Sequence, residues 1–236
     1  MDNIANNIRQ IKVLLEEFSI NSHRNSDTVK VLAVSKGQGA EKLLAAWHAG
    51  IQCFGENYLQ EALEKITTLS DINPEWHFIG PVQSNKTKDI ARHFSWVHTV
   101  DRIRVATRLS EHRQGVAQPL NICIQVNIDS EAGKSGVEPH AILDLANTIC
   151  ELPNLRLRGL MVLPRPRTGF AAERQPFRRV AQLLEELKSN IPQFESLDTL
   201  SMGMSNDWAA AIHEGATIVR IGTGIFGPRQ TRALKE

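Results

Sequence analysis

The segment VKVLAVSKGQG, Val29–Gly39, places a lysine shortly after a run of apolar residues. The run Val31–Val34 is typical of a buried β-strand. Lys36 follows almost at once, and Gly37 comes next. The segment therefore predicts a strand whose carboxyl end presents a lysine.

A short apolar strand followed by a helical pattern recurs along the chain. Eight strands are predicted, over Val29–Val34, Gln52–Phe54, Glu75–Ile79, Trp96–Thr99, Leu120–Val126, Leu157–Leu163, Thr199–Met202 and Thr217–Ile221. Apolar residues at helical spacing predict helices over Ile4–Phe18, Glu41–Ala49, Leu59–Leu69, Arg102–His112, Ala141–Cys150, Phe177–Lys188 and Asp207–Glu214. Ser135–Glu138 has capping-box spacing, which predicts a helix start, and Pro164–Pro176 is predicted to be an irregular loop.

Strands that alternate with helices indicate an α/β fold, a (β/α)8 TIM barrel, with a doubly wound open sheet as the main alternative. The 236 residues are close to the roughly 250 of a typical barrel. Because no linker divides the chain, we expect one domain over residues 1–236. Little chain follows the last strand, so the leading helix is expected to fill the last place in the outer ring.

Composition argues against several classes of function. With 27 Lys and Arg against 26 Asp and Glu, there is no electrostatic case for binding nucleic acid or an anionic membrane. No apolar run approaches the roughly 18 residues of a membrane helix, and the polar N-terminus is unlike a signal peptide. Three dispersed cysteines fit a reduced, cytoplasmic compartment. The histidines lack metal-site spacing, G-x-S-x-G is absent, and His77 is interpreted as a core histidine.

The carboxyl ends of the strands carry the active site of a TIM barrel. The residues predicted there are mostly polar: Lys36, Glu56, Asn57, His77, Gln83, Asn85, Asp101, Asn127, Met161, Ser201–Ser205 and Arg220–Thr223. Partial burial disfavours the charged form of a lysine and lowers its pKa. A lysine with a lowered pKa is a nucleophile suited to forming a Schiff base with a carbonyl. Taken alone, Lys36 is more typical of a surface lysine just past a strand.

Two glycine-containing segments follow the last two strands, where barrels often bind phosphate. In SMGMSND, Ser201–Asp207, Gly203 and the candidate N-cap Ser205 favour an anion-binding turn, although alone the segment is more typical of an ordinary turn. VRIGTGIFG, Val219–Gly227, contains G-x-G-x-x-G, but the nine residues that follow cannot complete a dinucleotide-binding unit. A lysine and a phosphate cradle at one mouth suit a ligand with an aldehyde and a phosphate. Pyridoxal 5′-phosphate (PLP) has that pair.

Arg220 lies within the last predicted strand, between two aliphatic residues. Beside a pyridine nitrogen it would keep that nitrogen unprotonated and weaken the ring as an electron sink. A structural salt bridge inside the barrel accounts for it equally well.

The chain resembles the YggS/PROSC family of pyridoxal phosphate homeostasis proteins over nearly its whole length. The matching motifs are AVSK (Ala33–Lys36), FGENY (Phe54–Tyr58), HFIGPVQSNK (His77–Lys86), VHTVDR (Val97–Arg102), QVNIDSEAGKSG (Gln125–Gly136), GLM (Gly159–Met161), SMGMSND and VRIGTGIFG.

The resemblance implies a barrel like the N-terminal domain of alanine racemase, a fold type III PLP protein, with PLP as a Schiff base on Lys36. It also implies that Arg220 faces the pyridine nitrogen and that Asn57 lies beside the cofactor. The phosphate would be held by the backbone around Ser201, Met202, Gly203, Met204 and Ser205, and by Gly222 and Thr223. The expected function is PLP binding in intracellular PLP homeostasis without turnover. Relatives lead us to expect a monomer or weak dimer, with PLP-dependent apoenzymes as candidate recipients.

The chain departs from the family pattern just after Lys36. Many relatives have a second lysine two positions later and then a proline, where this chain has Gln38 and Gly39. Glu131 and Lys134 are candidates for a secondary contact, although a solvated loop is the better interpretation of both.

Two alternative functions remain, a racemase-like PLP enzyme and a Schiff-base aldolase without a cofactor. A racemase needs acid and base groups on both faces of its substrate. Related racemases bring a tyrosine from a C-terminal domain, whereas this chain ends soon after its last strand and has one tyrosine, Tyr58. We therefore expect binding rather than racemisation.

Overall fold

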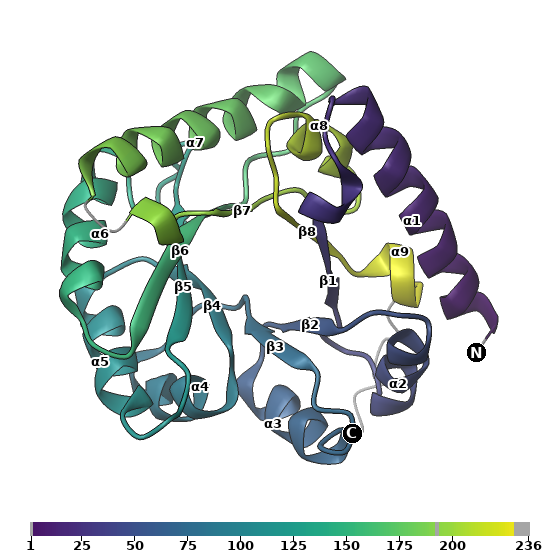
Figure 1. The fold of residues 1–236 in the computed structure, drawn as a ribbon, viewed down its shortest axis with the longest axis horizontal. Helices are drawn as coiled ribbons and strands as arrows, with labels where there is room; N and C mark the ends of the chain where they lie inside the picture. The colour runs from purple at the N-terminus through teal and green to yellow at the C-terminus, as the bar shows by residue number, and fades with distance from the viewer. Residues whose placement is uncertain (1, 192–193, 229–236) are drawn as a thin grey trace.

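The computed structural model describes residues 2–191 and 194–228, and its strands form a closed barrel. Figure 1 shows the eight parallel strands in chain order, closed by pairing of β8 with β1. The strands are β1 (Lys30–Val34), β2 (Cys53–Glu56), β3 (Glu75–Phe78), β4 (Trp96–Val100), β5 (Leu120–Val126), β6 (Leu155–Val162), β7 (Thr199–Ser201) and β8 (Ile218–Ile221). The predicted TIM barrel is confirmed, and each predicted strand overlaps an observed one.

Helices cover the outside of the barrel (Figure 1). They are α1 (Asp2–Asn21), α2 (Ala40–His48), α3 (Leu59–Thr68), α4 (Thr87–His93), α5 (Ile103–Arg113), α6 (Ile142–Glu151), α7 (Phe170–Asn190), α8 (Trp208–His213) and α9 (Thr223–Phe226). Because both faces of a parallel sheet are covered in this fold, the strands are apolar along most of their length. Helix α1 lies along α8, α9 and α2. Its Phe18 ring packs edge-on against Trp208, with the two ring centroids 5.0 Å apart. The place predicted for the leading helix is thus confirmed. None of the described helices is long and apolar enough to cross a membrane.

Two local predictions need correction. The capping box at Ser135–Glu138 does not begin a helix, because the backbone of Val137 bonds to Gln125 and Asn127 beside β5. The helical turn begins instead at Pro139 and leads into α6. The loop predicted over Pro164–Pro176 is helical from Phe170, since α7 accommodates Pro176 in its interior. Helices α4 and α9 were not predicted.

Gly159 on β6 allows the backbone of β7 to approach closely. A Cβ at this position would lie 1.9 Å from the backbone oxygen of Thr199, and the glycine has a φ of +151°. Any side chain here would therefore push apart two strands that pair in the closed barrel.

We expect Gly159→Ala to lower the free energy of unfolding by about 3 kcal/mol or more, because it adds a backbone clash to an unfavourable φ. Gly115→Ala is the matched control, since Gly115 has a φ of +83° with no atom near its Cβ position. It should cost about 1 kcal/mol. Urea unfolding measures both, and equal effects would contradict the close approach of β6 and β7.

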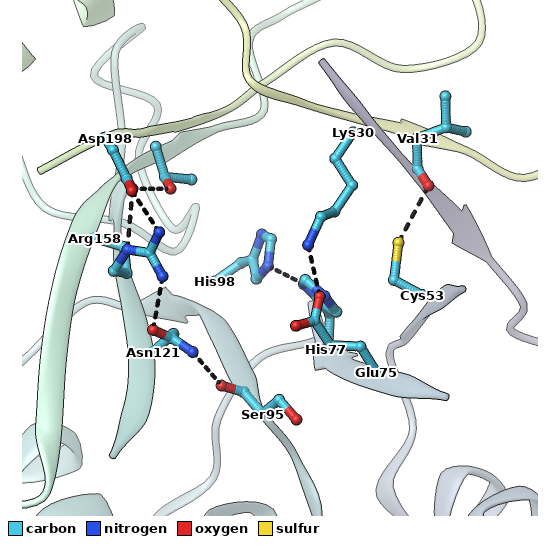
Figure 2. A network of polar contacts seen from close by, with 11 residues as sticks. Lys30, Val31, Cys53, Glu75, His77, Ser95, His98, Asn121, Arg158 and Asp198 are labelled. Atoms are coloured by element: carbon cyan, nitrogen blue, oxygen red, sulfur yellow. Dashed lines mark hydrogen bonds and ion pairs between the residues drawn. The ribbon is translucent and has the colours of Figure 1, made fainter. Parts of the chain in front are cut away.

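The amino-terminal end of the barrel contains two polar networks (Figure 2). In the first, Lys30 donates to Glu75 Oε1 (2.8 Å), which also contacts His77 Nε2 (2.8 Å). His77 Nδ1 lies 2.8 Å from His98 Nε2, and both rings are fully buried. His77 is thus a core histidine, as predicted, but it lies in this network and not at the mouth of the barrel, where it was also predicted. The second network joins Ser95, Asn121, Arg158, Asp198 and Thr199.

The two buried histidines predict loss of stability in acid. Burial lowers the pKa of both His77 and His98, whereas a histidine of the unfolded chain takes up a proton near about pH 6.5. Below that pH the unfolded state binds more protons than the folded state, so the free energy of unfolding falls. We expect a loss of about 1 kcal/mol per histidine between about pH 7.5 and about pH 5.5.

Urea unfolding at the two pH values measures this loss. His98→Gln should remove about half of the histidine contribution, whereas H140Q, at an exposed site, should retain all of it. If the free energy of unfolding of His98→Gln fell with pH as much as that of the wild type, the buried His77 and His98 rings would not both be neutral in the folded state.

Candidate functional site

A cavity of about 230 Å³ opens at the carboxyl ends of the strands. Its lining contains seven of the ten predicted cofactor-binding residues: Lys36, Asn57, Met204, Ser205, Arg220, Gly222 and Thr223. The other lining residues are Val34, Gln38, Ile79, Met161, Leu163 and Gly227. Among these described residues there are two cationic side chains and no carboxylate, so the cavity favours an anionic ligand.

Lys36 lies on a turn that is fixed on both sides. The Ser35 hydroxyl donates to Glu56 Oε1 (2.6 Å), and the Gly37 N–H donates to Glu61 Oε1 (2.5 Å). Lys65 of α3 joins these groups, because its Nζ donates to the Ser35 carbonyl (2.7 Å) and to both carboxylates (2.6 Å each). The backbone that carries Lys36 is therefore held before any ligand binds.

Lys65 and Glu61 were missed as site residues in the sequence. Lys65 is 5% exposed and Glu56 is fully buried. Burial raises the pKa of Glu56, and the charge and hydrogen bond of Lys65 oppose that rise. The available signal was the i,i+4 spacing of Glu61 and Lys65, which is typical of a helical ion pair.

Asn57 presents a polar atom that needs a partner. Its Oδ1 is buried and has no hydrogen bond within the described part of the chain. Leaving such an atom without a partner costs free energy, which a donor on a ligand in the cavity would recover. Gly80 makes this placement possible, because a Cβ there would lie 2.1 Å from the Asn57 backbone oxygen.

Arg220 reaches the cavity from β8 with its guanidinium already oriented. Nη1 donates to the carbonyl (2.6 Å) and hydroxyl (2.8 Å) of Ser201, and Nη2 donates to the Val162 carbonyl (2.8 Å). The salt-bridge alternative is wrong for the described residues, since none of these partners is a carboxylate. Burial lowers the pKa of Arg220 to about 10, so it remains a cation at neutral pH.

The two predicted phosphate segments differ in what they offer. Ser201 and Met202 are buried behind the cavity, and Gly203 supplies a left-handed turn with a φ of +89°. The Met204 N–H already donates to Asp207 Oδ1 (2.6 Å). Thr223 begins α9 beside Gly222, and the first N–H groups of a helix lack acceptors within it. The prediction of Ser205 as an N-cap is wrong, because α8 begins at Trp208 with Asp207 as its N-cap residue. Ser205, Gly222 and Thr223 line the cavity and are therefore the better placed groups for an anion.

The remaining candidates differ in how close they lie to the cavity. Several residues predicted at the mouth are not among its lining residues: Glu56, Gln83, Asn85, Asp101 and Asn127. Gln38 is buried in the cavity wall, where its Oε1 accepts from Lys42 (2.8 Å). Lys134 donates to Glu131 (2.6 Å) and to the carbonyl of Leu163, a lining residue (2.8 Å). Tyr58 is 64% exposed and is not among the lining residues.

We expect Lys65→Met to destabilise the fold by about 3–5 kcal/mol, because it leaves the Glu56 carboxylate buried without its cation. Lys188→Met is the control, since Lys188 pairs with Glu185 (2.8 Å) at the surface. Loss of such a pair should change stability by less than about 1 kcal/mol. Urea unfolding near neutral pH compares them, and similar small effects would contradict the role given to Lys65.

Comparison with known proteins places this chain in a family. The family model described as alanine racemase, N-terminal domain, matches residues 1–230. A pyridoxal phosphate homeostasis protein from Pseudomonas aeruginosa is 51% identical over 229 residues, covering 97% of each chain.

Solved structures agree with this relationship. PipY of Synechococcus elongatus with PLP bound is 32% identical, with a TM-score of 0.83 over 95% of this chain and 100% of that chain. Alanine racemase from Corynebacterium glutamicum is 18% identical, with a TM-score of 0.66 over all of this chain and 63% of that one, and shows the fold alone. The chain therefore belongs to the family of pyridoxal phosphate homeostasis proteins, built on the fold of the alanine racemase N-terminal domain.

Proposed function

We propose that this protein binds PLP in the cavity at the carboxyl ends of the strands and acts in PLP homeostasis without catalytic turnover. The observation that carries the proposal is the convergence of Lys36, Arg220 and the unpartnered Asn57 Oδ1 on one small cavity. PipY, the structural relative with PLP bound, supports the choice of ligand.

The residues present fit this cofactor. PLP supplies an aldehyde, which an amine converts to a Schiff base with loss of water, and a ring that can act as an electron sink. Lys36 provides the amine from a turn held by Glu56, Glu61 and Lys65. Ser205, Gly222 and Thr223 would hold the phosphate, and Asn57 would accept a hydrogen bond from the ligand.

Arg220 favours storage over turnover. As a cation it donates hydrogen bonds but cannot accept one, so beside a pyridine nitrogen it would leave that nitrogen unprotonated. This weakens the ring as an electron sink. Racemisation also needs an acid or base on the second face of the substrate, and Tyr58 is not among the lining residues. PLP-dependent apoenzymes are the recipients we propose for the stored cofactor, and we propose that the protein acts as a monomer.

The visible absorption spectrum of the purified protein with added PLP tests the proposal. We expect a Schiff-base band and, after borohydride reduction and peptide mapping, a pyridoxyl group on Lys36. Lys36→Ala should abolish both. Lys42→Ala removes another lysine of the same region and should retain both.

Incubation with D- or L-alanine separates storage from racemisation. We expect no PLP-dependent interconversion above a protein-free PLP control. Turnover that is lost in Lys36→Ala would establish a racemase instead, and absence of a band with PLP would overturn the proposal as a whole.

A further inference from the structure

A line of buried polar side chains connects the cavity to the opposite end of the barrel. Arg220 Nη1 contacts Ser201 Oγ (2.8 Å), which lies 2.8 Å from His98 Nδ1. The first polar network then continues it, from His98 to His77 (2.8 Å) and from His77 to Glu75 (2.8 Å). Figure 2 shows the part of this line from His98 to Glu75, which Lys30 also contacts.

The chemistry of the two ends determines the direction of each hydrogen bond. A guanidinium can only donate, so Ser201 Oγ accepts from Arg220. The Ser201 hydroxyl then donates its own proton to Nδ1 of His98. A neutral ring that accepts at Nδ1 carries its proton at Nε2. His98 therefore donates to His77 Nδ1, and His77 in turn donates from Nε2 to Glu75.

The reverse direction requires one more proton. If His77 donated to His98 from Nδ1, its Nε2 would need a second proton to bond the ionised Glu75. That cation would be fully buried between Lys30 and Arg220. Burial is the largest effect on the pKa of His77 and lowers it, as does the charge of Lys30, whereas Glu75 raises it. The net pKa of His77 lies below its usual value, so the cation is disfavoured.

The other groups around the two rings do not change this assignment. The titratable or charged residues on the surrounding strands include Lys30, Cys53, Glu75, Cys123, Arg158 and Arg220. Burial raises the pKa of the Cys53 and Cys123 thiols to about 12, so both are uncharged near neutral pH. The guanidinium of Arg158 lies over the Trp96 ring at 4.8 Å, and that ring stacks on His77.

We propose that Ser201, His98, His77 and Glu75 are positioning residues for Arg220, which they orient through a hydrogen-bond chain of fixed direction across the barrel. The chain begins with an obligate donor and ends on a carboxylate, so each member has one low-energy orientation. It thus holds the guanidinium against Ser201 and sets how Arg220 meets a ligand. This last step rests on the proposed PLP site, whereas the direction of the chain does not.

The direction is tested by long-range ¹H–¹⁵N NMR of the histidine rings near neutral pH, on protein without added PLP. We expect His77 and His98 to be neutral and protonated at Nε2. Protonation of either ring at Nδ1 would overturn the proposal.

Glu75→Gln tests control from the far end. A glutamine amide can accept from His77 or donate to it, which permits the reversed chain without an added proton. We expect Nδ1-protonated forms to appear at both histidines, together with about three- to tenfold weaker PLP binding and a displaced pH midpoint of the visible band. Asp198→Asn is the matched control, because Asp198 is a paired carboxylate at the same end that belongs to the second network. It should change none of these readouts.

The outcomes separate the two proposals. If Glu75→Gln behaves like Asp198→Asn in ring protonation and in the PLP band, the positioning chain is wrong. If the wild-type protein shows no band with PLP, the proposed function fails, and so does any effect of the chain on that cofactor.

Discussion

Closure of the barrel removes its interior from water, and this constraint governs the rest of the structure. An inward-facing polar group in a closed barrel must find its partner among the other strands. His77 and His98 are fully buried and Arg220 is 3% exposed, yet each has hydrogen bonds to groups on other strands. The polar interior therefore ties together strands that are distant in sequence, so strand position and side-chain orientation depend on each other.

The same constraint explains why the turn after β1 is rigid. Glu56 on β2 is buried at the carboxyl end of the barrel, where a carboxylate without a cation would be costly. Lys65 supplies the cation at Glu56 Oε1, and the same ammonium group also binds the Ser35 carbonyl beside Lys36. A requirement for satisfying a buried charge thus fixes the lysine that we propose to bind the cofactor. Such support from neighbouring groups is what a precise binding site needs.

The fold was largely predictable because its signals are local and repeated. Eight apolar runs alternating with helical patterns indicate a TIM barrel even though some boundaries were displaced. Segments where tertiary contacts override local preference were not predictable. Val137 bonds to the backbone at the carboxyl end of β5 rather than starting a helix, and Pro176 is accommodated inside α7.

In the site, too, what followed from the order of the strands was predictable and what depended on tertiary contacts was not. Lys36, Asn57 and Arg220 were predicted because strand ends converge at one mouth of a barrel. The role of Lys65 was not, since nothing in the spacing of its helix shows that a buried carboxylate lies beside it. The connection from Arg220 to His98 was also hidden, because it joins residues on β8, β7 and β4 whose pairing in space depends on barrel closure.

The buried carboxylates and Arg220 differ in how their charges are compensated within the barrel. Glu56 and Glu75 each contact a lysine, so the charges in these positions are locally compensated. Arg220 instead binds two carbonyl oxygens and a hydroxyl, which orient the guanidinium without neutralising it. Its charge is therefore available to the cavity, whose described lining contains no carboxylate. An anionic ligand in the cavity would compensate the charge that the protein leaves open at Arg220.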